Sequence, residues 1–179
     1  MKILAISGAL RKGSTNTALL RALAERALED MTIDVATLHG IPLYDGDWEI
    51  AHGKPEAAVA LDERIREADG LIIATPECNF SVPGVLKNAT DWLSRGGNPF
   101  KWKRTGVVGA SAGPVGTARS QYHLRQNLQA LEAIIMPKPE IFVANSATKF
   151  DMDGRLTDEA TGKVIETWLA AFKDWVTRG

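Results

Sequence analysis

A polar loop close to the start of the chain carries the side chains best suited to chemistry. It follows the apolar run Ile3–Ile6 and precedes a stretch with leucines at helical spacing. Backbone N–H groups at a helix N-terminus lack intrahelical acceptors, and the helix dipole makes that end attractive to anions. Arg11 adds a full positive charge and a forked set of donors. The short side chains that could donate to phosphate oxygens are Ser7, Ser14, Asn16 and Thr17.

This loop matches neither of the two common nucleotide fingerprints. It lacks the Gly-x-x-x-x-Gly-Lys-Ser/Thr pattern of triphosphate-binding P-loops and the Gly-x-Gly-x-x-Gly pattern of dinucleotide-binding folds. A hydroxyl-rich loop with one arginine suits a terminal phosphate monoester, and flavodoxin-type folds place the phosphate of FMN at such a loop. The alternative is that residues 7–16 form only a solvated turn before a helix.

Strand-like and helix-like patterns alternate along the chain and predict the elements that hold this loop. Helices are expected over residues 17–28, 56–68, 83–94, 117–135 and 157–176, with Thr117 and Thr157 at the starts of the last two. Residues 40–55 are expected to form a loop whose large apolar side chains pack on something, such as another subunit. The expected strands are Ile3–Ile6, Thr32–Leu38, Gly70–Thr75, Thr105–Ser111 and Ile141–Ala144.

This alternation predicts an α/β fold with a parallel sheet and helices on both faces. Five strands in a chain of 179 residues favour a flavodoxin-like three-layer sandwich with the strand order 2-1-3-4-5. In that fold the ligand crevice opens beyond the carboxyl ends of strands one and three. We expect residues 1–179 to form a single domain of this kind.

Three loops therefore meet at the carboxyl ends of the predicted strands: Ser7–Asn16, Pro76–Phe80 and Ser111–Thr117. A flavin ring needs a flat slot with backbone N–H donors near its carbonyl groups. Gly113 and Gly116 would let the backbone approach a ring closely. The alternative is that these two glycines only form a tight turn.

Composition limits the classes of partner and compartment. The formal net charge of −1 does not favour nucleic acid or an anionic membrane surface as a partner. The chain has one cysteine and no apolar run of membrane-spanning length, and its beginning lacks the pattern of a signal peptide. We therefore expect a cytoplasmic protein. The three histidines show no metal-ligand spacing, so no metal site is expected.

Three segments of the chain resemble a known family, the NAD(P)H-dependent FMN reductases, and in particular its bacterial quinone and chromate reductases. They read Ser-Gly-Ala-Leu-Arg-Lys-Gly-Ser-Thr-Asn (7–16), Pro-Glu-Cys-Asn-Phe-Ser-Val-Pro-Gly-Val-Leu-Lys-Asn (76–88) and Gly-Ala-Ser-Ala-Gly-Pro-Val-Gly-Thr-Ala-Arg (109–119). The resemblance extends over nearly the whole chain. The sequence departs from the family pattern at Ala9, where a serine is usual, and at Cys78, where a tyrosine is usual.

The resemblance implies bound FMN, a nicotinamide electron donor, and dimers or tetramers. Matching positions assign the phosphate to Ser7, Arg11, Ser14 and Asn16, and the flavin lining to Pro76, Glu77, Cys78, Asn79 and Ser111. The implied function is transfer of electrons from NAD(P)H through FMN to quinones or similar small acceptors, in a ping-pong mechanism that needs no catalytic side chain. The alternatives are a flavodoxin-type electron carrier that is not an enzyme and, more remotely, a phosphate-binding module without a redox role.

Two further expectations concern single residues. Cys78 is expected to be a small apolar filler and dispensable, with a reactive thiol beside the flavin as the alternative. Arg119 and Tyr122 lie three residues apart on one helix face, so they are candidates for a subunit interface, with Glu140 of a neighbouring subunit as a partner. The alternative for Arg119 is a solvated surface charge.

Overall fold

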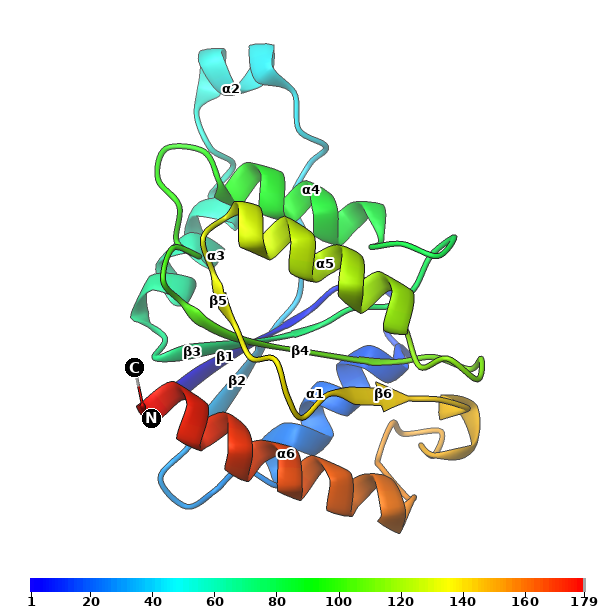
Figure 1. Cartoon of the computed structure of the whole chain (residues 1–179). Helices are drawn as coiled ribbons and strands as arrows, with labels where there is room; N and C mark the ends of the chain where they lie inside the picture. Colours follow the sequence, from blue (N-terminus) through cyan, green and yellow to red (C-terminus); the bar gives the residue numbers. More distant parts are fainter. Residues whose placement is uncertain (179) are drawn as a thin grey trace.

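A computed structural model describes residues 1–178 and has one parallel six-stranded sheet at its centre (Figure 1). The strand order is β2-β1-β3-β4-β5, with β6 also paired to β4. This order confirms the predicted flavodoxin-like α/β topology, although the number of strands differs from the five expected. The strands are β1 (Lys2–Ser7), β2 (Thr32–Ala36), β3 (Gly70–Ala74), β4 (Arg104–Ala110), β5 (Ile134–Ile135) and β6 (Ile141–Val143).

Helices cover both faces of the sheet because the central strands are apolar on both sides. In β1, Ile3 and Ala5 pack into one core cluster, whereas Leu4 and Ile6 pack into the other. Figure 1 shows α1 and α6 on one face and α3, α4 and α5 on the other. The bounds of these helices are α1 (Thr15–Glu25), α3 (Glu56–Glu67), α4 (Gly84–Leu93), α5 (Ala118–Ala130) and α6 (Glu159–Thr177).

The last strand position is divided between two short strands. β6 matches the strand predicted at residues 141–144, whereas the sequence patterns did not predict β5. The expectation that a helix runs to Ile135 is wrong, because α5 ends at Ala130 and Glu132 takes a left-handed φ of 57°. β5 pairs with the beginning of β4 through Ile134 and Arg104, and β6 pairs with its end through Ile141 and Val108. Between them lie Pro137 and Pro139, which cannot donate to a strand ladder.

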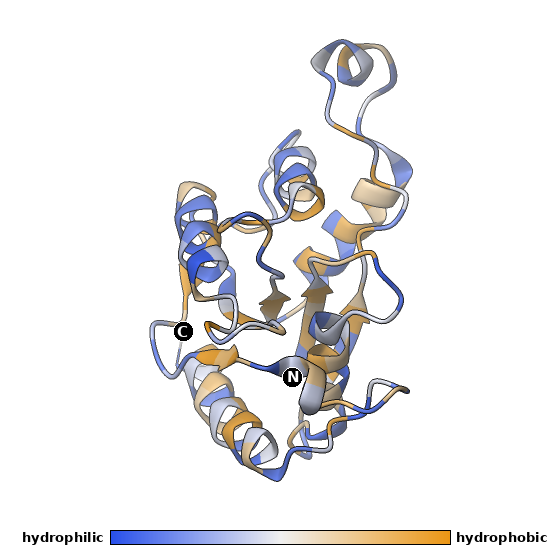
Figure 2. Cartoon of the chain, turned by 90° about the vertical axis from the view of Figure 1, so that its right-hand side faces the viewer, coloured by the Kyte–Doolittle hydropathy of each residue, from blue (hydrophilic) through white to orange (hydrophobic). Residues whose placement is uncertain are grey.

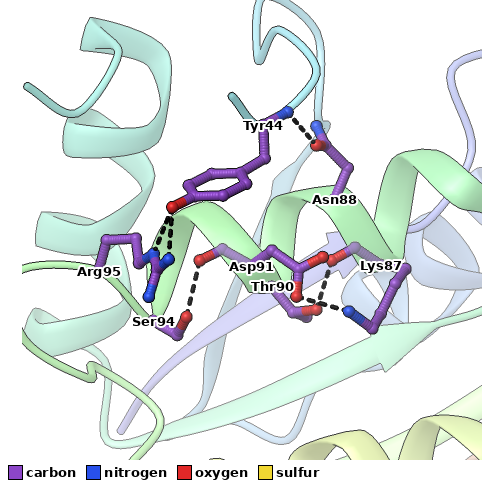
Figure 3. A network of polar contacts seen from close by, with 7 residues as sticks. All are labelled: Tyr44, Lys87, Asn88, Thr90, Asp91, Ser94 and Arg95. Carbon is purple, nitrogen blue, oxygen red and sulfur yellow. Dashed lines mark hydrogen bonds and ion pairs between the residues drawn. The ribbon is translucent and has the colours of Figure 1, made fainter. Parts of the chain in front are cut away.

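The segment expected to be a loop at residues 40–55 contains a short helix, α2 (Gly46–His52), whose N-cap is Asp45. Figures 1 and 2 both show α2 standing away from the rest of the molecule. Figure 3 shows how the segment is anchored, with Tyr44 lying between Asn88 and Arg95. The Tyr44 N–H donates to Asn88 Oδ1 at 2.8 Å, and Arg95 Nε donates to the Tyr44 hydroxyl at 3.0 Å.

Two predicted helix starts differ from the structure in their capping. α6 is capped by Asp158 rather than Thr157, and the Asp158 carboxylate accepts from the N–H of Thr161 at 2.8 Å. Thr117 precedes α5 as expected, but it has a left-handed φ of 69°, and its hydroxyl makes no capping bond and accepts instead from Gln121 Nε2 at 3.2 Å. Within residues 1–178, no helix has the length and apolar character needed to cross a membrane.

Candidate functional site

The three candidate loops follow β1, β3 and β4 at the carboxyl ends of these strands. This side of the molecule faces the viewer in Figure 2. We call them the first loop (residues 8–14), the second loop (76–81) and the third loop (111–117). Gly8 joins the first loop to β3, because its N–H donates to the Ala74 carbonyl at 2.8 Å. A Cβ on Gly8 would lie only 2.9 Å from that carbonyl oxygen and 3.1 Å from Pro76 Cδ. The close packing of the two loops therefore requires glycine at this position.

The first loop leads directly into α1, so that part of the polar segment expected to be a turn is helical. Ser14 is the N-cap, and its hydroxyl accepts from the N–H of Asn16 at 3.2 Å. The Ser7 and Thr17 hydroxyls lie 2.8 Å apart, and both side chains are buried. The structure thus brings together the hydroxyls that the sequence assigned to phosphate, and it pairs two of them with each other.

Asn16 connects the first loop region to the end of β4. Its Nδ2 donates to the Ala110 carbonyl at 2.9 Å, and its Oδ1 accepts from the Ala110 N–H at 2.9 Å. The side chain is buried, with 4% of its surface exposed. Asn16 therefore acts on the site by fixing α1 against the strand that carries the third loop.

Arg11 lies in the first loop with an exposed side chain. Within residues 1–178, its guanidinium makes no ion pair and no hydrogen bond. In the same part of the chain, the N–H groups of Thr15 and Thr17 at the start of α1 have no acceptor. A charged donor beside unpaired backbone donors is the donor set that a phosphate group requires.

The second loop contains a tight turn between Cys78 and Ser81, whose N–H and carbonyl groups bond each other at 3.0 and 2.9 Å. Its central residues, Asn79 and Phe80, both have left-handed φ values of 49° and 65°, as a type I′ turn requires. Cys78 is exposed, so the expectation that it fills an apolar space is wrong. Because the turn is closed through the backbone, its hydrogen bonds do not depend on the Cys78 side chain, and the dispensability of that side chain stays a prediction.

Glu77 fixes the second loop to the beginning of α5. Its carboxylate accepts from Arg119 Nε at 2.6 Å and from the N–H groups of Arg119 and Ser120 at 3.2 and 3.4 Å. The Arg119 guanidinium lies 3.7 Å from the centre of the Phe80 ring. Arg119 therefore has partners within its own chain, a contact that sequence reasoning missed because Glu77 and Arg119 lie far apart in the sequence. The one signal that could have indicated this contact is a glutamate placed just after a strand without a nearby cation in sequence.

The two glycines of the third loop differ in their surroundings: Gly116 is closely packed, whereas Gly113 has open space beside it. Gly116 has a φ of 61°, and a Cβ there would lie 2.6 Å from the Phe142 carbonyl carbon, so only glycine fits. Gly113 has ordinary φ, and the nearest atom to its Cβ position is Ser111 Oγ at 3.9 Å. The space next to Gly113 is therefore available to a ligand, whereas the tight-turn explanation accounts for Gly116.

The remaining interface candidates are also placed by the structure. Glu140 pairs within the chain with Lys138 and, at 3.7 Å, with Arg125. Tyr122 is half-exposed, and its ring centre lies 6.3 Å from that of Phe142. An interface through these residues stays a prediction.

The three loops offer hydroxyls, backbone donors and two cations without a partner in residues 1–178, Arg11 and Lys12, but no free carboxylate or histidine. Their one carboxylate, Glu77, is bound to Arg119 and α5, and their sequences contain no histidine. General acid–base or nucleophilic chemistry would need such a group within reach of a substrate. The arrangement instead suits a bound group that brings its own chemistry.

Comparison with known proteins gives consistent matches. A family model described as NADPH-dependent FMN reductase matches residues 1–148. The chain is 46% identical to an NAD(P)H-dependent FMN reductase of Pseudomonas aeruginosa over 179 residues, covering 99% of this chain and 96% of the relative. It is 41% identical to a quinone reductase of Escherichia coli K12 over 181 residues, with 99% and 96% covered. The solved structure of the Paracoccus denitrificans flavoenzyme FerB, an NAD(P)H:(acceptor) oxidoreductase, has a TM-score of 0.89 and 33% identity, with 99% of this chain and 97% of that chain covered.

Proposed function

The chain belongs to the NADPH-dependent FMN reductase family, and from this premise we propose that it binds FMN across its three loops and passes electrons from NAD(P)H to quinone-like acceptors. The observation that carries the proposal is Arg11, an exposed guanidinium without a partner within residues 1–178, beside the unpaired N–H groups of Thr15 and Thr17. A flavin phosphate satisfies all three donors at once.

In this proposal the predicted residues divide into two groups. Arg11, Ser14 and the first-turn N–H groups of α1 hold the phosphate directly. Ser7, Thr17 and Asn16 position that cradle, because their polar atoms are engaged with one another or with Ala110. The ring lies between the second and third loops, lined by Pro76–Asn79, Ser111 and Gly113.

When bound, FMN supplies the redox chemistry, taking two electrons from NAD(P)H and giving them to the acceptor. The chain binds the phosphate, orients the ring through backbone groups and keeps the second loop in place through the Glu77–Arg119 pair. The second and third loops are short and fixed at both ends, so they define a single slot. Donor and acceptor would then use this slot in turn, which is a ping-pong mechanism.

Steady-state kinetics test this mechanism. Double-reciprocal plots of rate against NADPH concentration at several quinone concentrations should give parallel lines. Intersecting lines would require both substrates to be bound together, and they would contradict the single shared slot.

A flavodoxin-type electron carrier is the alternative that shares this fold. Such carriers present strongly acidic faces to protein partners, and the formal net charge of −1 does not favour this role. Anaerobic addition of NADPH separates the two, since a carrier needs a partner reductase. Bleaching of the flavin absorbance by NADPH alone supports the reductase, and an unchanged spectrum contradicts it.

We also propose that the protein is a homodimer or homotetramer, because apolar side chains of the segment around α2 and on α5 remain uncovered. Leu43 and Ile50 are 83% and 87% exposed, and Tyr122 is 51% exposed. Arg119 and Glu140 already have partners within the chain, so Tyr122 is the stronger candidate for a subunit contact. Light scattering at micromolar concentration tests this proposal, and a mass near 19.4 kDa would contradict it.

A further inference from the structure

A cavity of about 720 Å³ lies beside the first loop and contains none of the residues of the second or third loop. One of its walls is formed by residues 11–15 together with Ala18 and Arg21 of α1. The opposite wall is formed by residues 146–147 and 150–154, which follow β6. The proposed function places the FMN phosphate at Arg11 and Ser14 on the first wall, but it assigns no role to Lys12, Arg21 or the second wall.

Specific contacts hold the two walls of this cavity together. The Ser146 hydroxyl donates to the Thr15 hydroxyl at 3.2 Å. Gly154 has a φ of 78°, and a Cβ built there would lie 3.6 Å from the Cβ of Ala18, so the second wall passes close to α1 at this point as well. The hydrogen bond and this close approach make the cavity part of the fold.

The α1 wall of the cavity is positively charged. Arg11, Lys12 and Arg21 all line it, and within residues 1–178 none of the three makes an ion pair or a side-chain hydrogen bond. In the proposed function, Arg11 is the one cation that binds the flavin phosphate, together with Ser14 and backbone N–H groups of α1. Lys12 and Arg21 remain as two cations of this wall without an assigned anionic partner.

The opposite wall has a different chemical character. Phe150 is half-buried, and Met152 is fully exposed, so both present apolar surface. The Asp151 carboxylate is engaged by the backbone N–H groups of Asp153 and Arg155 at 3.0 and 2.8 Å. The Asp153 carboxylate has no donor within the described residues, and it can accept from an amino group. Apolar contacts with a carboxylate beside them suit an aminated heteroaromatic base.

The cavity also adjoins the proposed flavin slot. The N–H groups of Ser146 and Asn145 donate to the carbonyls of Ser111 and Gly113 in the third loop, at 2.9 and 3.1 Å. Arg11 and Ser14, which hold the flavin phosphate in the proposed function, also line the cavity. A dinucleotide with its nicotinamide in the slot can therefore place its other half along the first loop.

We propose that this cavity binds the adenosine 2′-phosphate half of NADPH, with Lys12 and Arg21 as the residues that select NADPH over NADH. The phosphate lies against the two cations, the adenine lies against Phe150 and Met152, and Asp153 accepts from the adenine amino group. A volume of about 720 Å³ lies within the range of small-molecule sites. The inference rests on the proposed function in that the donor meets the flavin in the adjoining slot.

Binding of adenosine fragments tests the proposal without turnover. Isothermal titration of the FMN-loaded protein with adenosine 2′,5′-bisphosphate should give an affinity at least roughly tenfold higher than that with AMP, which lacks the 2′-phosphate. The double variant Lys12→Ala/Arg21→Gln should lose this difference. Lys163→Ala is the matched control, because Lys163 is an exposed lysine of α6 outside the cavity.

Kinetics provide the second readout. In the double variant, KM for NADPH should rise roughly tenfold to a hundredfold, while KM for NADH and the affinity for FMN stay at their wild-type values. Equal losses with both donors, or unchanged discrimination between them, would overturn the inference. Weaker FMN binding in the double variant would also overturn it, because the two cations would then serve the flavin phosphate. Failure of NADPH to reduce the wild-type flavin would refute the proposed function, whereas bisphosphate binding would still decide the role of the cavity.

Discussion

Replacing Asn16 with alanine should separate positioning of the site from direct binding of phosphate. The Asn16 side chain makes two hydrogen bonds to the backbone of Ala110, both at 2.9 Å, and both residues are buried. In the Asn16→Ala variant, the Ala110 N–H and carbonyl lose these partners inside the protein. An unsatisfied buried group costs about 1–3 kcal/mol. Because water can enter the space left and satisfy part of the loss, we expect the free energy of unfolding to fall by about 2–4 kcal/mol.

Thermal unfolding of the protein without FMN measures this loss. For a chain of this size, each kcal/mol lowers the midpoint by about 2–4 °C, so a fall of about 5–15 °C is expected. Asn127→Ala in α5 is the matched control, since its side chain makes no hydrogen bond within the described residues. Both positions are helical, so the gain in helix propensity cancels in the comparison. An unchanged midpoint with weakened FMN binding would refute the reasoning and assign the Asn16 amide to phosphate.

Four further outcomes are expected from the same structure. Arg11→Ala should weaken FMN binding about tenfold to a hundredfold in a fluorescence titration, with the midpoint of the FMN-free protein unchanged, because Arg11 has no partner within residues 1–178. Cys78→Ser should retain most NAD(P)H oxidation with saturating quinone, and loss of turnover with FMN still bound would indicate a reactive thiol. Gly116→Ala should lower stability or yield, because a Cβ there would lie 2.6 Å from a carbonyl carbon of β6. A hydrogen bond from the Thr161 hydroxyl holds the pKa of Asp158 below its ordinary value of 3.8. The stabilisation by Asp158 is therefore present above that pH and lost as the pH falls below it, so Asp158→Asn should flatten this part of the stability profile.

The sheet topology was predictable because its central strands carry an unambiguous pattern. β3 consists of apolar residues buried on both faces, and an amphipathic stretch follows each of β1, β3 and β4. Such a pattern leaves few arrangements other than a parallel sheet with helices on both sides. The position of the three loops at the carboxyl ends of the strands follows from this topology. The sequence therefore indicated which segments form the candidate site.

The outer strand β5 was not predictable, because short strands carry little periodic signal. Ile134 and Ile135 continue the apolar spacing of α5, and only the left-handed backbone at Glu132 separates them from the helix. Within residues 40–55, the helix α2 depends on a cap at Asp45 rather than on an apolar stripe. In both cases local geometry and tertiary contacts decide the structure, and these leave no periodic pattern of apolar residues in the sequence.

Side-chain roles within the site were the hardest to predict, as two of its arginines illustrate. Arg11 and Arg119 both lie close to polar loops, and the sequence suggested a phosphate ligand for one and an interface or a solvated charge for the other. In the folded chain Arg119 is held by Glu77 and the Phe80 ring, whereas Arg11 has no partner within residues 1–178. An arginine that is already neutralised has little to gain from a new anion, whereas a free one pays no cost of breaking an existing pair. The difference between these two side chains therefore supports the proposal that a phosphate binds at the first loop and not at the start of α5.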